Sequence, residues 1–197
     1  MNALNCDEQD AHDMSQLARG HDAALNALMD RHGPKLFQYL LRCLQDPSDA
    51  ADLAQETFVK IYQHRANFDP RQKFTSWMYA IACNLVRDRY RWRTRHPQVS
   101  LEVETEQSPG TFKDRLASAA PAPDEQLEGE ERALSVRQAV AALPEELRQP
   151  LILAVYQDLP QAEIAAILGC SIKAVETRIY RARRRLRQTL VPLDVGA

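Results

Sequence analysis

Apolar residues recur every three or four positions along most of this chain of 197 residues, which is the spacing of one face of an α-helix. We find no sustained alternation of apolar and polar residues and no Asn-Gly hairpin turn, the two patterns that favour strands. The sequence therefore predicts an all-α protein. Between Asp22 and Gln45 it predicts two helices that separate at Gly33-Pro34, because glycine favours a helix end and proline a first helical turn.

Two more helices are predicted in the first half of the chain. One occupies residues 46–65, with Ser48 as its N-cap. The other follows a turn at "NFDPRQ" and runs from about Phe74 to Arg95. The inward face of the first of these helices carries Leu53, Phe58 and Ile61.

The character of the sequence changes after residue 96. Residues 97–131 contain four of the eleven prolines, and nine acidic residues against Lys113 and Arg115, a net charge of 2 − 9 = −7. Little of this segment can pack into a core. We therefore expect two small helical domains, residues 1–96 and 130–197, joined by a flexible acidic linker over residues 97–129.

The second half ends in a predicted helix-turn-helix. Two helices, the second bent by Pro150, precede a short helix from about Pro160 to Leu168. Gly169 suits the positive φ of a tight turn, and the hydroxyl of Ser171 can cap the helix that follows.

The final helix carries a dense cluster of positive charge. Residues 171–188 hold seven Lys or Arg residues and one acid, a net charge of 7 − 1 = +6, in a protein whose formal net charge is −2. Residues 84–96 hold five Arg residues against Asp88, a net charge of 5 − 1 = +4. The apolar stripe of the final helix leaves its basic residues off the buried face, and it consists of Val175, Ile179, Ala182, Leu186 and Leu190.

This charge pattern predicts binding to the major groove of DNA, where Lys and Arg meet phosphates and guanine edges. A solvated basic helix is the alternative interpretation, but few acids lie at compensating positions and the preceding helix and turn have the spacing of the motif. The first residues of the helix should read bases, and Arg183 to Arg187 should hold phosphates. The predicted DNA-contacting residues are Ser171, Lys173, Ala174, Thr177, Arg178, Tyr180, Arg181 and Arg185.

Two stretches resemble one bacterial family. "DLAQETFVKIY" followed by "FTSWMYAIACNLVRDRYRWR" resembles the sigma factors of the extracytoplasmic-function type, and "LPEELRQPLILAVYQDLPQAEIAAILGCSIKAVETRIYRARRRLR" is similar to their fourth conserved region. The matches cover most of residues 15–96 and 130–188, in the family's order. The resemblance implies sigma region 2 in residues 1–96, sigma region 4 in residues 130–197, and a subunit that directs RNA polymerase to promoters.

The resemblance also implies roles for residues of the first half. The helix bearing Asp52, Gln55, Glu56 and Phe58 would bind the coiled coil of the polymerase's largest subunit, although its spacing alone fits a capped surface helix. Phe68 and Asn84 match the family's pocket for a flipped base of the −10 element. Mixed basic and aromatic character along the melted strand would come from Lys73, Trp77, Arg87, Arg89, Tyr90 and Arg91, with a core role for Trp77 as the alternative.

The sequence departs from the family at several positions. Ala80 and Cys83 stand where relatives often have polar residues, Ala154 stands where an Arg is common, and Pro160 replaces the usual Ser cap. These changes put individual phosphate contacts in doubt. The acidic linker suggests the hypothesis that it follows the basic cleft of the polymerase as a mimic of nucleic acid.

Other functional classes have less support. A stand-alone transcription regulator is the main alternative, whereas an enzyme would need motifs that are missing: there is no phosphate-binding glycine loop and no G-x-S-x-G. We expect no cofactor and no metal, because the histidines lack metal-binding spacing. The scattered cysteines are typical of reduced cytosolic thiols, and direct sensing of a thiol or metal stimulus is left open; they are Cys6, Cys43, Cys83 and Cys170.

The protein should work in the cytoplasm. Its longest apolar run, Leu151 to Tyr156, is far short of the roughly 20 residues that span a bilayer. The first residues are acidic, unlike the basic start of a signal peptide. The resemblance further implies an anti-sigma partner.

Overall fold

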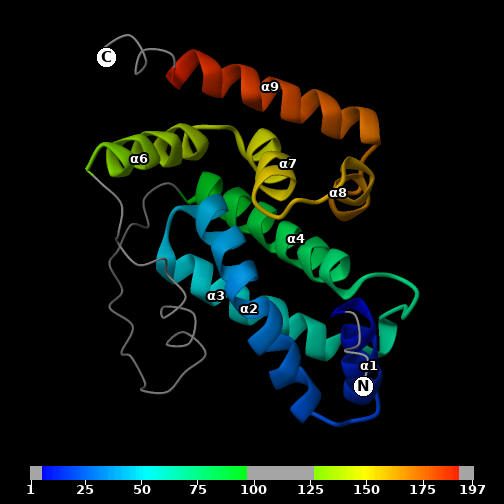
Figure 1. Cartoon of the computed structure of the whole chain (residues 1–197). Helices are drawn as coiled ribbons and strands as arrows, with labels where there is room; N and C mark the ends of the chain where they lie inside the picture. The colour runs from blue at the N-terminus through cyan, green and yellow to red at the C-terminus, as the bar shows by residue number, and fades with distance from the viewer. Residues whose placement is uncertain (1–5, 97–126, 191–197) are drawn as a thin grey trace.

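The computed structural model describes residues 6–96 and 127–190, apart from the side chains of residues 127–132 (Figure 1). Over these ranges all regular structure is helical, which confirms the all-α prediction. The predicted linker lies outside the described residues except for its last three positions, which open a helix. None of the helices in the described ranges combines the length and apolar character needed to cross a membrane.

The first half of the protein packs around helix α2. Helices α1, α3 and α4 all pack against it (Figure 1). The long helix that the sequence places at Phe74 to Arg95 is confirmed, whereas the sequence predicted no helix at α1. The elements are α1 (Cys6–Ala18), α2 (Ala23–Leu44), α3 (Pro47–Gln63), the 3-10 turn η1 (Arg65–Asn67) and α4 (Phe74–Arg95).

The predicted break at Gly33-Pro34 is wrong, because α2 continues through both residues. Proline inside a helix costs about 3 kcal/mol, since its backbone lacks one hydrogen-bond donor. Leu28 before the proline and Leu36 and Leu40 after it are fully buried in the same core. Each buried leucine contributes about 1.5 to 3 kcal/mol, so burial of both halves on one axis outweighs the proline.

The N-cap of helix α3 lies two residues before the residue that the sequence indicates. The N-cap is Asp46, whose side chain accepts a hydrogen bond of 3.0 Å from the backbone N–H of Asp49. Pro47 is the first helical residue, a position where its fixed φ and missing N–H carry no penalty. The prediction of Ser48 as the cap is therefore wrong.

The second half folds as the sequence predicts. Gly169 has a φ of +64°, and the Ser171 hydroxyl accepts a hydrogen bond of 3.2 Å from the N–H of Ala174. Val175, Ile179 and Ala182 are buried, which confirms the inner part of the predicted stripe. The elements are α6 (Leu127–Ala141), α7 (Glu145–Val155, with Pro150 inside it), α8 (Gln161–Leu168) and α9 (Ile172–Leu190).

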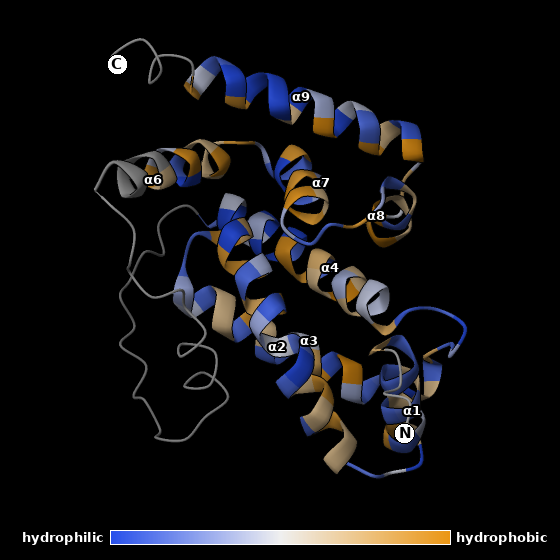
Figure 2. Ribbon diagram, in the orientation of Figure 1, coloured by the Kyte–Doolittle hydropathy of each residue, from blue (hydrophilic) through white to orange (hydrophobic). Residues whose placement is uncertain are grey.

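The two halves share one hydrophobic core. Helices α6 and α7 contact α2, and α7 and α8 contact α4, so α6 to α8 lie between α9 and the first half (Figure 1). Figure 2 shows α7 and α8 as strongly hydrophobic and α9 as largely hydrophilic with isolated hydrophobic positions. Helix α9 therefore presents one side to this core and leaves its other side to solvent.

A group of buried thiols and phenols lies where the halves meet. The Tyr39 hydroxyl is 3.1 Å from Cys83 Sγ and donates to Gln149 Oε1 over 3.2 Å. Burial raises the pKa of Cys83 from 9.0 to about 12, and it also raises the pKa of Cys43 and of Tyr39 and Tyr79 well above their ordinary values. These groups stay protonated and uncharged in the folded protein at neutral pH.

We expect the free energy of unfolding to fall as the pH rises above about 9. The unfolded chain then releases thiol and phenol protons that the folded state retains, so the unfolded state binds fewer protons. Each such group contributes a slope of up to about 1.4 kcal/mol per pH unit until it ionises in the folded state as well. Urea denaturation across the alkaline range measures this slope.

The matched variant is the double substitution Cys43→Ala and Cys83→Ala. It removes two of the buried protons and should flatten the alkaline slope, whatever it does to stability at neutral pH. An alkaline slope equal to that of the unmodified chain would show that these thiols ionise freely in the folded protein.

Candidate nucleic-acid interface

The outer face of α9 is open over most of its length. The side chain of Lys173 is 86% exposed and its Nζ lies 3.3 Å from Glu176 Oε2, while Tyr180 is 67% exposed. Arg181 and Arg185 are also exposed. These cations are available to a polyanion along the helix axis.

The small polar residues at the start of α9 have partners within the helix. The Ser171 oxygen caps the helix, and the Thr177 hydroxyl donates 2.8 Å to the carbonyl of Lys173. Ser171 can still donate its own hydroxyl proton, and Ala174 is half-buried. The hydroxyl groups of Ser171 and Thr177 are thus oriented by the helix itself.

Arg178 differs from the other predicted contacts. It is half-buried, and its Nη1 donates to Cys170 Sγ over 3.6 Å. It lines a cleft of about 600 Å³ between the C-terminal half of α4 and helices α7 to α9. The structure thereby brings Arg178 of α9 together with three predicted residues of α4, which are Arg87, Tyr90 and Arg91. The charged residues around the cleft are Arg87, Arg91, Arg95, Arg178, Glu145 and Glu146.

The predicted residues for the −10 element fall into two groups. Phe68, just after η1, lies 5.2 Å from Trp77 and 6.3 Å from Phe74 between ring centroids. Trp77 is half-buried against the core, so it has a packing role. Asn84 is exposed two helical turns further along α4, about 10 Å from Trp77, and its Oδ1 accepts from Arg87 Nη1 over 3.2 Å.

Helix α8 covers part of this face of α4. The Ser76 hydroxyl donates 2.6 Å to Glu163 Oε1, and Lys73 Nζ lies 3.6 Å from Glu163 Oε2. Arg87 Nη2 donates 3.1 Å to the carbonyl of Leu168. Two of the predicted −10 residues are thus engaged by the second half of the chain in this arrangement.

Arg89 and Tyr90 do not lie along an open path for a DNA strand. Arg89 Nη1 is 2.7 Å from Asp49 Oδ1, and Arg93 pairs with the same carboxylate, which ties α4 to the start of α3. The Tyr90 hydroxyl donates to the carbonyl of Cys43 and is half-buried at the meeting of the two halves. The prediction for Arg89 and Tyr90 is therefore corrected, because both residues join helices.

The exposed face of α3 carries three of the four residues predicted to meet the polymerase. Asp52, Gln55 and Glu56 are exposed, and Glu56 Oε1 is 3.8 Å from Lys60 Nζ. Phe58 is only 2% exposed, so the prediction of a direct contact by Phe58 is corrected: it anchors the helix in the core. The sequence did not indicate a neighbouring groove of about 450 Å³, which lies between α3 and α4 and is lined by Leu53, Glu56, Lys60, Leu85, Asp88, Arg89 and Trp92.

A helix-turn-helix with an open basic face, joined to a second helical unit with its own basic and aromatic face, defines a DNA-binding protein with two separate contact surfaces. Residues 28–96 match the family model of Sigma-70 region 2, and residues 133–186 match that of Sigma-70 region 4. The chain belongs to the extracytoplasmic-function sigma factors of the sigma-70 family. Such a subunit directs promoter-specific transcription initiation by RNA polymerase, which excludes the alternative of a stand-alone regulator.

Individual relatives match along nearly the whole chain. The RNA polymerase sigma-H factor of Pseudomonas aeruginosa is 31% identical, over 94% of this chain and 96% of its own length. The extracytoplasmic-function sigma factor SigW of Bacillus subtilis is 30% identical, over 90% of this chain and 94% of its own. The solved structure of CnrH in complex with the cytosolic domain of CnrY is similar with a TM-score of 0.65 and 28% identity, over 96% of this chain and 99% of CnrH. The relatives are sigma factors rather than enzymes.

We expect Glu163→Ala to loosen α8 from α4. The variant loses the hydrogen bond from Ser76 and the ion pair with Lys73, at a cost of about 1 kcal/mol, which corresponds to about a fivefold rise in the open population. Helix α8 has only 8 residues and depends on packing for its stability. Its amide hydrogens should therefore exchange about fivefold faster, as measured by mass spectrometry.

Gln161→Ala is the matched control, since Gln161 is exposed on the same helix. Its exchange rates in α8 should stay close to those of the unmodified protein. Equal exchange in the two variants would mean that Glu163 does not hold the halves together.

Proposed function

We propose that this chain uses three surfaces. Helix α9 reads the −35 element of a promoter, and Phe68, Asn84 and the basic residues of α4 bind and open the −10 element. The outer face of α3 docks on the coiled coil of the polymerase's largest subunit. The observation that supports this most directly is the open basic face of α9. Lys173 and Arg181 are exposed on this face, and the helix begins at the cap of Ser171 after the turn at Gly169. A recognition helix contacts base edges with its N-terminal residues, and the exposed Lys173 near the start of α9 supports this role. The chain would act in the cytoplasm, where the polymerase meets the chromosome.

The surface of α3 combines acidic and apolar groups, which suits a partner with both basic and apolar side chains. Asp52 and Glu56 supply acidic groups, and Val59 is 45% exposed beside them. The groove next to Glu56 ends at Trp92, which is 44% exposed. An apolar centre with an acidic edge matches a basic, amphipathic helix pair.

The arrangement of the two halves adds a step to this function. Lys73, Ser76 and Arg87 are engaged by α8, so these contacts compete with contacts to promoter DNA. We infer that region 4 leaves the face of α4 before both elements are bound. The closed arrangement is then a resting form, and the polymerase and promoter favour the open one.

An anti-sigma partner fits the same two surfaces. CnrH, the relative with 28% identity in its solved structure, was solved in complex with the cytosolic domain of CnrY. A protein that binds both α3 and the cleft between α4 and α9 would block polymerase and promoter together. We propose that such a partner regulates this chain.

The test of this function is transcription in vitro with core RNA polymerase and mapped start sites. We expect Lys173→Ala to weaken use of the mapped promoters by about 1 to 3 kcal/mol, roughly 5- to 150-fold, with the loss confined to promoters that carry the native −35 sequence. Gln188→Ala, an exposed change near the end of the same helix, is the control. Equal activity of the Lys173→Ala variant on native and scrambled −35 sequences would argue against base reading by α9, and failure of the chain to direct any initiation would contradict the function itself.

We expect Asn84→Ala to impair DNA opening more than initial binding. The exposed amide can bond the edge of an unpaired base, an interaction absent from the closed duplex. Permanganate reactivity of unpaired thymines measures opening, and a gel shift of the polymerase complex measures binding. Thr94→Ala, also exposed on α4, should leave both unchanged; an equal loss of opening and binding in Asn84→Ala would remove the flipped-base role.

A further inference from the structure

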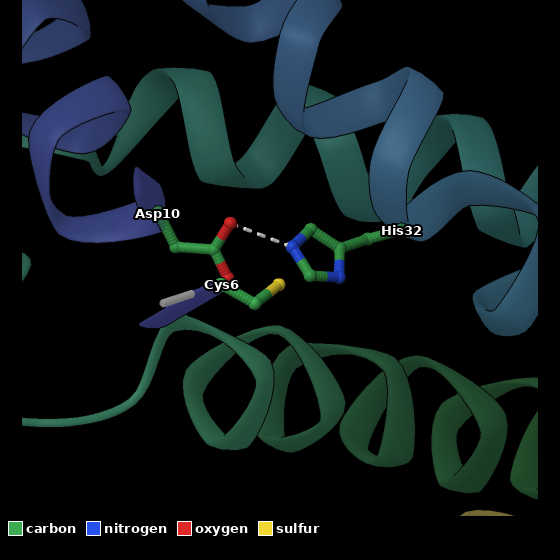
Figure 3. A group of neighbouring side chains, drawn as sticks. All are labelled: Cys6, Asp10 and His32. Atoms are coloured by element: carbon green, nitrogen blue, oxygen red, sulfur yellow. Dashed lines mark hydrogen bonds and ion pairs between the residues drawn. The ribbon is translucent and has the colours of Figure 1, made fainter. Parts of the chain in front are cut away.

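Three potential metal ligands meet where α1 crosses α2. Figure 3 shows Cys6 and Asp10 of α1 and His32 of α2 with their polar ends directed toward one another. One ligand atom from each residue, a thiol sulfur, a carboxylate oxygen and an imidazole nitrogen, lies within 4.8 Å of the other two. Asp10 and His32 are buried and Cys6 is exposed, so the group has a solvent-facing side.

The carboxylate of Asp10 is only half satisfied. Its Oδ1 lies 2.8 Å from His32 Nε2 and pairs with Arg31. Its Oδ2 is buried and has no hydrogen-bond partner among the described residues. A buried acceptor without a partner costs about 1 to 3 kcal/mol, and a cation bound to this carboxylate oxygen would remove that cost.

We propose that Cys6 Sγ, Asp10 Oδ2 and His32 Nε2 form a binding site for one Zn²⁺ ion, with water as the fourth ligand. Zn²⁺ accepts sulfur, nitrogen and oxygen donors in one tetrahedral site. Mg²⁺ and Ca²⁺ need several oxygen ligands, and this group offers a single carboxylate. The donor set therefore selects a borderline transition-metal ion.

Small movements convert the present geometry into a coordination shell. Bonds of about 2.0 to 2.3 Å place tetrahedral ligands about 3.5 Å apart, so Cys6 must approach and His32 Nε2 must exchange its contact with Oδ1 for the ion. Cys6 is the first residue of α1 and is exposed, which leaves its side chain room to turn. The helices themselves need not move.

The surrounding charges suit an occupied site. A thiolate from Cys6 and the carboxylate of Asp10 together balance a divalent ion. Arg31 keeps its pairing with Asp10 Oδ1 and so orients Oδ2 toward the ion, as outer-layer groups commonly do. The extra positive charge of Arg31 is itself balanced by Asp13, 2.8 Å away.

The other cysteines do not offer a comparable site. Burial raises the pKa of Cys43 and Cys83, so both remain protonated thiols at neutral pH. Cys170 accepts from Arg178, and the described residues contain no second group of three ligands. Cys6 is thus the thiol on which metal binding depends.

The site lies next to the aromatic group of Phe68 and Phe74, where Phe68 is proposed to bind the −10 element. The ring of His32 is 5.1 Å from that of Phe74, which in turn contacts Phe68. A bound ion would fix α1 to α2 and, through His32, restrict the movement of Phe74 and Phe68. Metal binding does not depend on the proposed promoter contacts, because it needs neither polymerase nor DNA.

The experiment uses the full chain, reduced and freed of metal by a chelator. Titration with Co²⁺ should give a 1:1 complex with an intense thiolate-to-metal absorption band in the near ultraviolet, which Zn²⁺ then abolishes. Zn²⁺ alone should raise the melting temperature. Cys6→Ser should lose the band and at least about tenfold in Zn²⁺ affinity, whereas Cys170→Ser should retain both.

The experiment distinguishes loss of metal binding from loss of folding. Because Cys6 is exposed, circular dichroism should show a folded Cys6→Ser variant whose melting temperature no longer responds to Zn²⁺. Absence of the band in the unmodified chain would overturn the proposal. So would a band of equal strength in Cys6→Ser, or its loss in Cys170→Ser.

Discussion

The closed arrangement of the protein depends on one buried cation, Arg148, which is only 8% exposed. Its guanidinium group uses all five N–H groups, and the acceptors are neutral oxygens from both halves of the chain. A buried charge without such partners would cost several kcal/mol, so the helices must converge on it. The acceptors are the carbonyls of Cys43, Ala141 and Leu143, the last used twice, and the hydroxyl of Tyr90.

The same cation makes the two halves separable. Ala141 and Leu143 belong to the half of the chain that carries Arg148, so three of its five hydrogen bonds persist when the halves part. Some of the other contacts across the boundary are polar, such as the Tyr79 hydroxyl that donates 2.6 Å to Gln157 Oε1, and buried apolar side chains of both halves form the core that they share. Polar groups regain water on separation, and each such bond contributes only about 0.5 to 1.5 kcal/mol net. Separation of the halves would therefore cost mainly the burial of the shared apolar core.

The sequence predicted the parts of the fold that local chemistry determines. The turn at Gly169, the cap at Ser171 and the extent of α4 depend on residues close in the chain, and all three are confirmed. The burial of Phe58 agrees with the inward face that periodicity predicted for α3. The continuity of α2 through Pro34 depends on packing partners far away in sequence, so periodicity alone could not settle it.

The candidate sites divide in the same way. Exposed Lys173 and Asn84 could be found from spacing and resemblance, whereas the roles of Arg89 and Tyr90 between helices follow only from the three-dimensional arrangement. The meeting of Arg178 with Arg87, Arg91 and Arg95 was equally hidden. Around that cleft four cations face Glu145 and Glu146, so the closed form confines like charges with incomplete compensation. If α4 and α9 bind separate DNA segments, as the proposed function requires, phosphate would neutralise each helix separately. That would lower the free energy of an open form by more than that of the closed form.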